Sequence, residues 1–162
     1  MILTEQGVFE EAIACLREGL AGGRRAMLFR PYGLARLAEA LSRLGQHGAA
    51  LVAVRDGLQE QKETGQGRWD AHLHRIEGSA LVGLNRVEEA ETALQEALRV
   101  ARHQLAKSYE LRAATSLARL WGEQGQREEA RDLLAPVYGW FTEGFDTADL
   151  KEAKGLLEQL TA

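Results

Sequence analysis

The stretch LNRVEEAETALQEAL, residues 84–98, decides the fold because three other stretches of the chain repeat its pattern. The pattern is a turn residue, a short polar link, an alanine and then an amphipathic run. The related stretches are QGVFEEAIACLREGL (6–20), LGQHGAALVAVRDGL (44–58) and QGQREEARDLLAPVY (124–138). Their shared alanines are Ala12, Ala50, Ala90 and Ala130, at spacings of 38, 40 and 40 residues. A period of this length is the signature of a repeat protein.

Each repeat is predicted to be a pair of helices, A and B, joined by a tight turn. Four positions after the shared alanine comes a large apolar residue, which places a packing stripe on one face of helix B. These large residues are Leu16, Val54, Leu94 and Leu134. Five positions before the alanine stand Gly7, Gly45, Asn85 and Gly125. Glycine and asparagine tolerate the left-handed conformation in which helices often end.

The composition of the chain agrees with an all-helical fold. Only two prolines occur in 162 residues, while Ala, Leu, Glu, Gln and Arg, the residues that lose least on entering a helix, dominate. We expect one all-α domain over 1–162, with a partial repeat at about 1–23. Full repeats are expected at about 31–63, 69–105 and 108–142, with a capping helix at about 147–160. The individual helices are predicted at 8–21, 31–44, 48–63, 69–84, 87–105, 108–123, 127–142 and 147–160.

The charge and hydropathy of the chain argue against several classes of protein. A net charge of −4 is too mild to favour nucleic acid as a partner. No apolar run approaches the length that spans a bilayer, and the amino-terminal sequence does not resemble a signal peptide. The single cysteine, Cys15, excludes an internal disulfide framework and is expected to be a buried, inert thiol. We therefore expect a cytoplasmic protein that contacts neither nucleic acid nor membrane.

The repeat resembles the tetratricopeptide repeat, which implies a right-handed array of helical hairpins. The order of large, small and aromatic residues matches that signature over most of the chain, although the period is near 40 rather than 34. The proline that usually ends helix B is also absent. Residues 106–160, including LARLWGEQGQREEARDLLAPVYGWFTEGFDTADLKEAKGLLEQL from Leu117 to Leu160, resemble the carboxyl-terminal region of bacterial multidomain cyclase–ATPase signalling proteins. The chain has neither a phosphate-binding loop nor the carboxylates of a cyclase, so those activities are not implied for it.

No set of residues in the sequence combines an acid, a base and a nucleophile, so we expect a non-enzyme without a cofactor. His72 and His74 are two positions apart and would point to different sides of a helix. Asp70, His74 and Glu77 share a face, but three groups on one helix face are more typical of a satisfied histidine than of a metal site. The tryptophans, with Tyr138 and Phe141, are expected to be core or inter-repeat contacts.

The resemblance implies a functional surface, because the A helices of tetratricopeptide arrays line the concave face. The partner-binding residues predicted there are Tyr32, Glu39, Arg43, His72, Arg75, Ser79, Arg112, Thr115 and Arg119. Four arginines against one glutamate favour an acidic peptide or a carboxylate terminus. The alternative is that these arginines belong to an ordinary solvated face. Two functions stay open: a protein-interaction or regulatory module, and a sensor of a small anionic effector.

A homodimer is a further expectation, because the first helix lacks a preceding A helix to cover it. The apolar residues assigned to this interface are Ile2, Leu3, Val8, Phe9 and Ile13. Exposed apolar patches mark interaction sites, and two-fold dimers are the commonest closed assemblies. The alternatives are that residues 1–21 fray, or that an upstream domain covers them.

Overall fold

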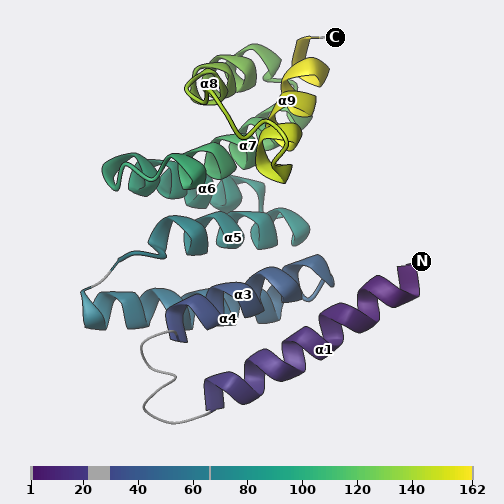
Figure 1. Cartoon of the computed structure of the whole chain (residues 1–162), viewed down its shortest axis with the longest axis vertical. Coiled ribbons are helices and arrows are strands. Elements are labelled where there is room, and N and C mark those ends of the chain that lie inside the picture. Colours follow the sequence, from purple (N-terminus) through teal and green to yellow (C-terminus); the bar gives the residue numbers. More distant parts are fainter. Residues whose placement is uncertain (1, 22–29, 66, 162) are drawn as a thin grey trace.

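The computed structural model describes residues 2–21, 30–65 and 67–161, without the side chains of residues 2–9 and 12. Over these ranges it contains eight helices and no strand (Figure 1). The helices are α1 (Ile2–Ala21), α3 (Arg30–Arg43), α4 (His47–Thr64), α5 (Asp70–Gly83), α6 (Val87–His103), α7 (Lys107–Glu123), α8 (Arg127–Gly139) and α9 (Ala148–Thr161). The predicted all-α class is confirmed. From α3 onward, each predicted helix end lies within three residues of the observed one.

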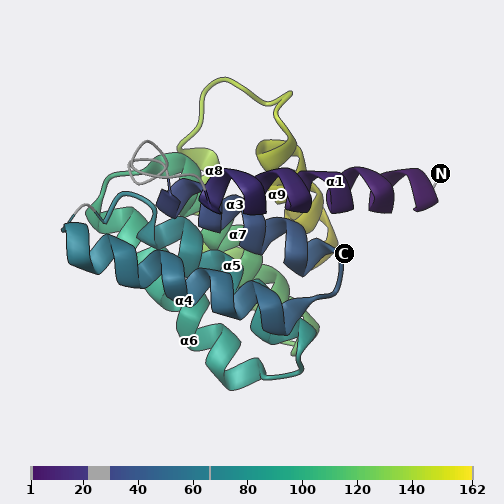
Figure 2. The same ribbon diagram turned by 90° about the horizontal axis from the view of Figure 1, so that it is seen from below.

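The helices from α3 to α9 pack in chain order, each against the next. The odd-numbered helices also contact one another, α3 with α5, α5 with α7 and α7 with α9. These four helices therefore form a continuous layer (Figure 1). Helix α1 packs against α3, and Figure 2 shows its amino-terminal end projecting beyond the other helices.

Small residues bring the paired helices together, as the sequence predicts. Ala50, Ala90 and Ala130 are completely buried. Helices α5 and α6 approach closely at Gly78, where a Cβ atom would lie 2.5 Å from Leu94 Cγ and 3.2 Å from the carbonyl oxygen of Ala90. Real Cβ atoms do not come so near to other carbon atoms, so glycine is required at position 78 by packing rather than by backbone conformation.

Helix α4 ends at the left-handed residue Gly65, with φ of 65°. Four other described helices end at left-handed residues that share one pattern of backbone hydrogen bonds. Gly45, Asn85 and Gly125 have φ of 74°, 59° and 86°, which confirms three of the four predicted turn residues. Leu105, with φ of 55°, ends α6 in the same way, although leucine is not a residue type that predicts this conformation. Each of these residues donates its N–H to the carbonyl three positions back, and the next residue donates five positions back. The prediction for Gly7 is wrong, because this residue lies inside α1.

Two other predictions are wrong. Cys15 is exposed rather than buried. Trp140 is 58% exposed and lies just after the end of α8, in the segment that leads to α9. Trp121, Tyr138 and Phe141 do pack, partly buried, against the core formed by α6 to α9.

Candidate partner-binding site

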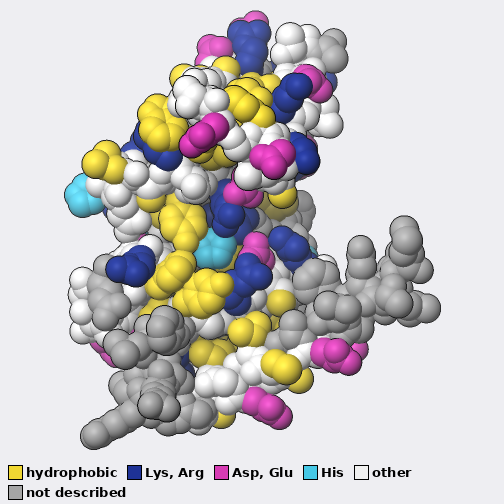
Figure 3. Space-filling model, in the orientation of Figure 1, with side chains coloured by type: hydrophobic (Ala, Val, Ile, Leu, Met, Phe, Trp, Pro, Cys, Tyr) yellow, Lys and Arg dark blue, Asp and Glu magenta, His cyan; other side chains and the backbone are white. Residues whose placement is uncertain are grey.

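A hollow of about 190 Å³ opens on the layer formed by α3, α5, α7 and α9. It is lined by Arg36, Glu39, Arg43, Arg75, Arg112, Thr115, Ser116, Asp149 and Glu152. Figure 3 shows this face: a histidine lies between hydrophobic side chains on one side and basic and acidic side chains on the other. The hollow itself brings four arginines and three carboxylates together from four helices.

Glu39 of α3 is the centre of the charged cluster. Its carboxylate accepts hydrogen bonds from Arg36 at 2.9 Å and from Arg75 at 3.2 Å, and it lies 3.5 Å from Arg43. Burial alone would raise the pKa of Glu39, but Arg75, with smaller contributions from His72, Arg43 and Arg36, lowers the pKa below its ordinary value. Glu39 is therefore an ionised carboxylate at neutral pH, shared among several arginines.

Arg75 of α5 is unusually enclosed for an arginine, since its side chain is only 16% exposed. Burial lowers the pKa of its guanidinium, and Glu39 opposes this shift. The buried Nε–H of Arg75 has no hydrogen-bond partner among the described residues. A guanidinium carries five N–H donors, so Arg75 retains donor capacity beside the hollow after it has bound Glu39.

The two arginines of α7 are paired with carboxylates of α9. Arg112 Nε donates to Asp149 Oδ2 at 2.7 Å, and Arg119 donates to Glu152 Oε1 at 2.6 Å. Sequence analysis did not include these acids, because it treated the capping helix as an end of the array rather than as a wall of the groove. The signal was available, since a capping helix that packs on α7 must turn one face towards the same groove.

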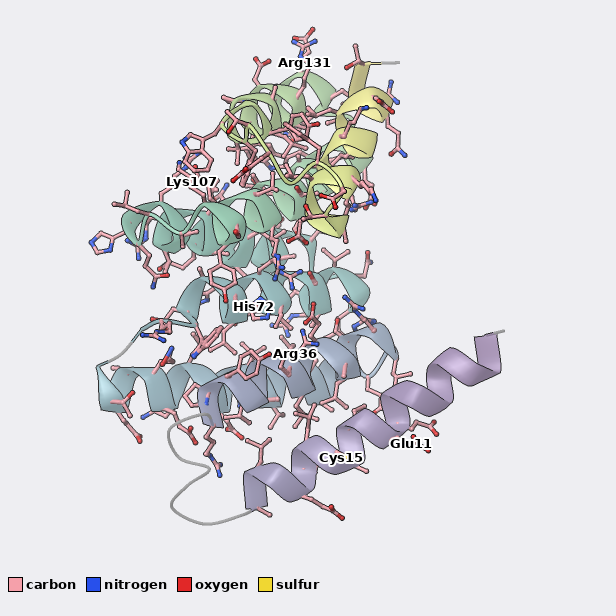
Figure 4. The ribbon with its side chains drawn as sticks, in the orientation of Figure 1. Glu11, Cys15, Arg36, His72, Lys107 and Arg131 are labelled. Carbon is pink, nitrogen blue, oxygen red and sulfur yellow. The ribbon has the colours of Figure 1, made fainter. Side chains whose placement is uncertain are left out.

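Aromatic rings border the charged cluster. The rings of Tyr32 and Trp69 lie 4.8 Å apart and those of Trp69 and Tyr109 lie 6.4 Å apart, centroid to centroid. His72 stacks on Tyr109 at 5.6 Å, and the Arg112 guanidinium lies 6.0 Å from the centroid of Tyr109. His72 and Arg36, labelled in Figure 4, lie on neighbouring helices of this face. Tyr109 thus joins the aromatic edge to the arginines.

His72 is a neutral group at physiological pH. Its side chain is 4% exposed, and its Nε2 lies 4.0 Å from Glu39 Oε2. Burial, followed by the nearby Arg75, lowers the pKa of His72 to about 4, although Glu39 acts in the opposite direction. His72 therefore adds no positive charge to the face at neutral pH.

The predicted partner-binding residues lie in three neighbouring parts of one face. Glu39, Arg43, Arg75, Arg112 and Thr115 line the hollow. Ser79 and Arg119 line an adjoining hollow of about 260 Å³, which also includes Arg75. Tyr32 and His72 belong to the aromatic edge.

Two of these residues have hydroxyl groups that are already engaged. Thr115 donates to the Leu111 carbonyl and Ser79 donates to the Arg75 carbonyl, within their own helices. They can still accept hydrogen bonds, but their donor capacity is used. The sequence-based prediction missed Arg36, Ser116 and the rings of Trp69 and Tyr109 at this face. Arg36 could have been found, since it lies three positions before Glu39 and therefore on the same side of the helix.

The residues assigned to a dimer interface are only partly described. The side chains of Ile2, Leu3, Val8 and Phe9 lie outside the described residues. Ile13 is 6% exposed and belongs to the buried cluster that α1 shares with α3 and α4. It therefore serves the core of this chain, and the dimer stays a prediction.

In the described part of the chain, no group of three or more His, Cys, Asp or Glu side chains is placed to hold a metal ion, and His74 pairs with Glu77 at 3.0 Å. None of the described helices is long and apolar enough to cross a membrane. Comparison with protein-family models and with curated protein sequences gives no match.

Proposed function

We propose that this chain is a non-catalytic binding module of the cytoplasm. It is a tetratricopeptide-like array of helices, and its α3–α5–α7 face receives an acidic segment of a partner protein. Support comes from the four arginines that three helices, α3, α5 and α7, direct into one hollow. Arginine is the side chain suited to carboxylates, because its planar fork donates two parallel hydrogen bonds to them.

One observation carries the proposal: Arg75 lines the hollow with a mostly buried side chain, shares the Glu39 carboxylate with two other arginines, and has an Nε–H without a partner among the described residues. A buried cation without a full set of acceptors costs free energy. A carboxylate that enters the hollow would supply further acceptors to the arginines that line it. The aromatic edge beside Arg112 gives an adjoining apolar surface for the rest of a peptide.

The test uses a fluorescein-labelled hexaglutamate peptide, with hexalysine as the opposite-charge control, and measures anisotropy at low ionic strength. The variant Arg36→Gln/Arg112→Gln removes two half-exposed cations from the hollow. It leaves the more enclosed Arg75 in place, so the fold is expected to persist. Its matched control is Arg127→Gln/Arg131→Gln, which removes the same charge from the exposed surface of α8.

Hexaglutamate should bind the unmodified protein and the α8 control with the same affinity. Its affinity for the Arg36/Arg112 variant should be lower by about tenfold or more, because charge-assisted hydrogen bonds are strong. The proposal is overturned if hexaglutamate does not bind, or if both double variants lose affinity equally. The second result would mean that net charge alone attracts the peptide. Helix content measured by circular dichroism shows whether each variant is folded.

A second function, sensing of a small anionic effector, is favoured by the size of the hollow. A volume of about 190 Å³ suits a few heavy atoms better than a long peptide. Thermal-shift measurements with succinate and citrate distinguish the two functions, since a ligand that binds only the folded state raises its melting temperature. A shift that exceeds the hexaglutamate shift at equal concentration would favour the sensor.

A further inference from the structure

Two acidic side chains of α9 already occupy the arginines of α7. Asp149 and Glu152 are three positions apart and therefore neighbours on one face of α9. They bind Arg112 and Arg119, which are seven positions apart and share one face of α7. Within the chain itself, this face of α7 thus binds a pair of carboxylates presented by a helix.

These carboxylates do not hold α9 in place. Helix α9 is fixed by its apolar face, where Leu150, Ala153, Leu156 and Leu160 are buried in the core formed with α6, α7 and α8. The side chains of Asp149 and Glu152 are 33% and 57% exposed. Ion pairs at such exposure contribute about 0–1 kcal/mol each. Either carboxylate can therefore leave its arginine without unfolding α9.

The same two carboxylates also line the hollow and repel an incoming anion. The lining has four arginines, and Asp149 and Glu152 are two of its three carboxylates. Without them, Glu39 would be the only negative group in the lining. A ligand with one carboxylate gains little here, because it must oppose two like charges and replace a contact that already exists. A ligand with two carboxylates can replace both contacts at once.

We propose that Asp149 and Glu152 are internal competitors for the anion site, so that it accepts segments with at least two neighbouring acidic residues and rejects those with one. The inference rests on the proposed function and deepens it, because it names the charge that the partner segment must carry. Asp149 and Glu152 are specificity-determining residues by this argument: they act by occupying the arginines that the ligand needs.

The experiment compares two fluorescein-labelled helical peptides that differ only in charge, one with two glutamates three positions apart and one with a single glutamate. Each is titrated at low ionic strength with the unmodified protein, with Asp149→Asn/Glu152→Gln, and with Glu128→Gln/Glu129→Gln. The last is the matched control, since these exposed α8 carboxylates form no ion pair in the described chain and lie outside the hollow.

The unmodified protein should bind the two-glutamate peptide about tenfold more tightly than the one-glutamate peptide. The variant Asp149→Asn/Glu152→Gln should bind the one-glutamate peptide about tenfold more tightly than the unmodified protein does, which is the order expected for removal of two nearby like charges. The control variant should change neither affinity by more than about twofold, since the interaction between exposed charges in water is weak and falls with distance. The single variants Asp149→Asn and Glu152→Gln, each checked for helix content, give the same answer if the double variant is unstable.

The outcomes separate the two proposals. If neither peptide binds any form of the protein, the proposed function fails and this inference fails with it. If the two-glutamate peptide binds but Asp149→Asn/Glu152→Gln does not tighten the one-glutamate peptide, the binding function stands and the competition is refuted. Equal tightening by the α8 control also refutes it, because net charge would then explain the effect.

Discussion

Arg75 of α5 donates a hydrogen bond to Glu39 of α3 at 3.2 Å, and the two side chains are only 16% and 18% exposed. This ion pair joins two helices that are adjacent in the layer but separated by α4 in the chain. Because both residues line the hollow, the pair contributes both to the stability of the layer and to the electrostatics of the candidate site.

The variant Glu39→Gln should destabilise the protein. It leaves the enclosed Arg75 without its charged partner, and removal of one member of a buried pair costs about 3–5 kcal/mol when burial is complete. Because nearly a fifth of Glu39 is exposed, we expect a smaller loss in the free energy of unfolding, about 2 kcal/mol. Urea unfolding measures this. Glu89→Gln is the control, since it breaks an ion pair with Arg86 that is exposed to solvent and should leave the urea midpoint nearly unchanged.

Stability should fall as the pH falls from about 6.5 towards 4, and His72 should be a main cause. The pKa of His72 is lowered from 6.5 to about 4 by burial and by Arg75. In this window the unfolded chain binds a proton at this position and the folded chain does not, so acidification favours unfolding. Glu39, whose pKa is also lowered, adds a loss in the same direction below its ordinary pKa.

Replacing His72 with glutamine removes this titration. The slope of unfolding free energy against pH should decrease by up to about 1.4 kcal/mol per pH unit between pH 6 and 4.5. The comparison is made by urea unfolding at several pH values, with His103→Gln, at an exposed position, as control. An unchanged slope in the His72 variant would show that this histidine is protonated in the folded state.

The parts of the fold that depend only on the spacing of residues along the chain could be predicted from the sequence. Ala50, Ala90 and Ala130 recur at nearly constant spacing and are all completely buried, because two helices can approach closely only over small residues. Three of the four arginines of the hollow, Arg43, Arg75 and Arg112, were predicted for the same reason, since their positions relative to the packing stripe fix the direction in which they point.

The features that sequence analysis missed depend on tertiary packing or on unfavourable local conformation. The contact of Asp149 with Arg112 requires knowledge of how α9 turns against α7, which no period in the sequence contains. Leu105 takes a left-handed conformation that its residue type disfavours, so the predicted helix 87–105 runs two residues past the observed end of α6 at His103. Here the packing of α7 on α6 overrides local preference.

The variant Leu105→Gly should stabilise the protein. Leu105 has a φ of 55° and is 81% exposed, so it bears the cost of a left-handed conformation and buries little surface in return. The left-handed conformation costs roughly 1–2 kcal/mol of folding free energy in leucine. The added flexibility of glycine in the unfolded chain reduces the gain from the substitution by about 0.5–1 kcal/mol. We expect a net gain of up to about 1 kcal/mol in urea unfolding. Leu84→Gly should destabilise instead, since Leu84 has a φ of −93° and has no such strain to lose.

The variant Gly78→Ala should destabilise the protein although alanine favours helices over glycine by about 1 kcal/mol. The new methyl group would lie 2.5 Å from Leu94 Cγ and 3.2 Å from the backbone oxygen of Ala90, so α5 and α6 must move apart. Overpacking of this kind costs about 1–3 kcal/mol and outweighs the helix preference. Because α5 carries Arg75, the same shift should weaken hexaglutamate binding.

Gly155→Ala gives the matched control for this experiment. Gly155 lies inside α9, and a methyl group there would meet no atom within 4 Å. This variant should gain about 0.5–1 kcal/mol from the reduced entropy of the unfolded chain. Urea unfolding of both variants thus separates packing from helix preference, which acts in the same direction at both sites. A gain in stability in Gly78→Ala comparable to that in Gly155→Ala would mean that α5 and α6 are farther apart than described, and that the glycine has no packing role.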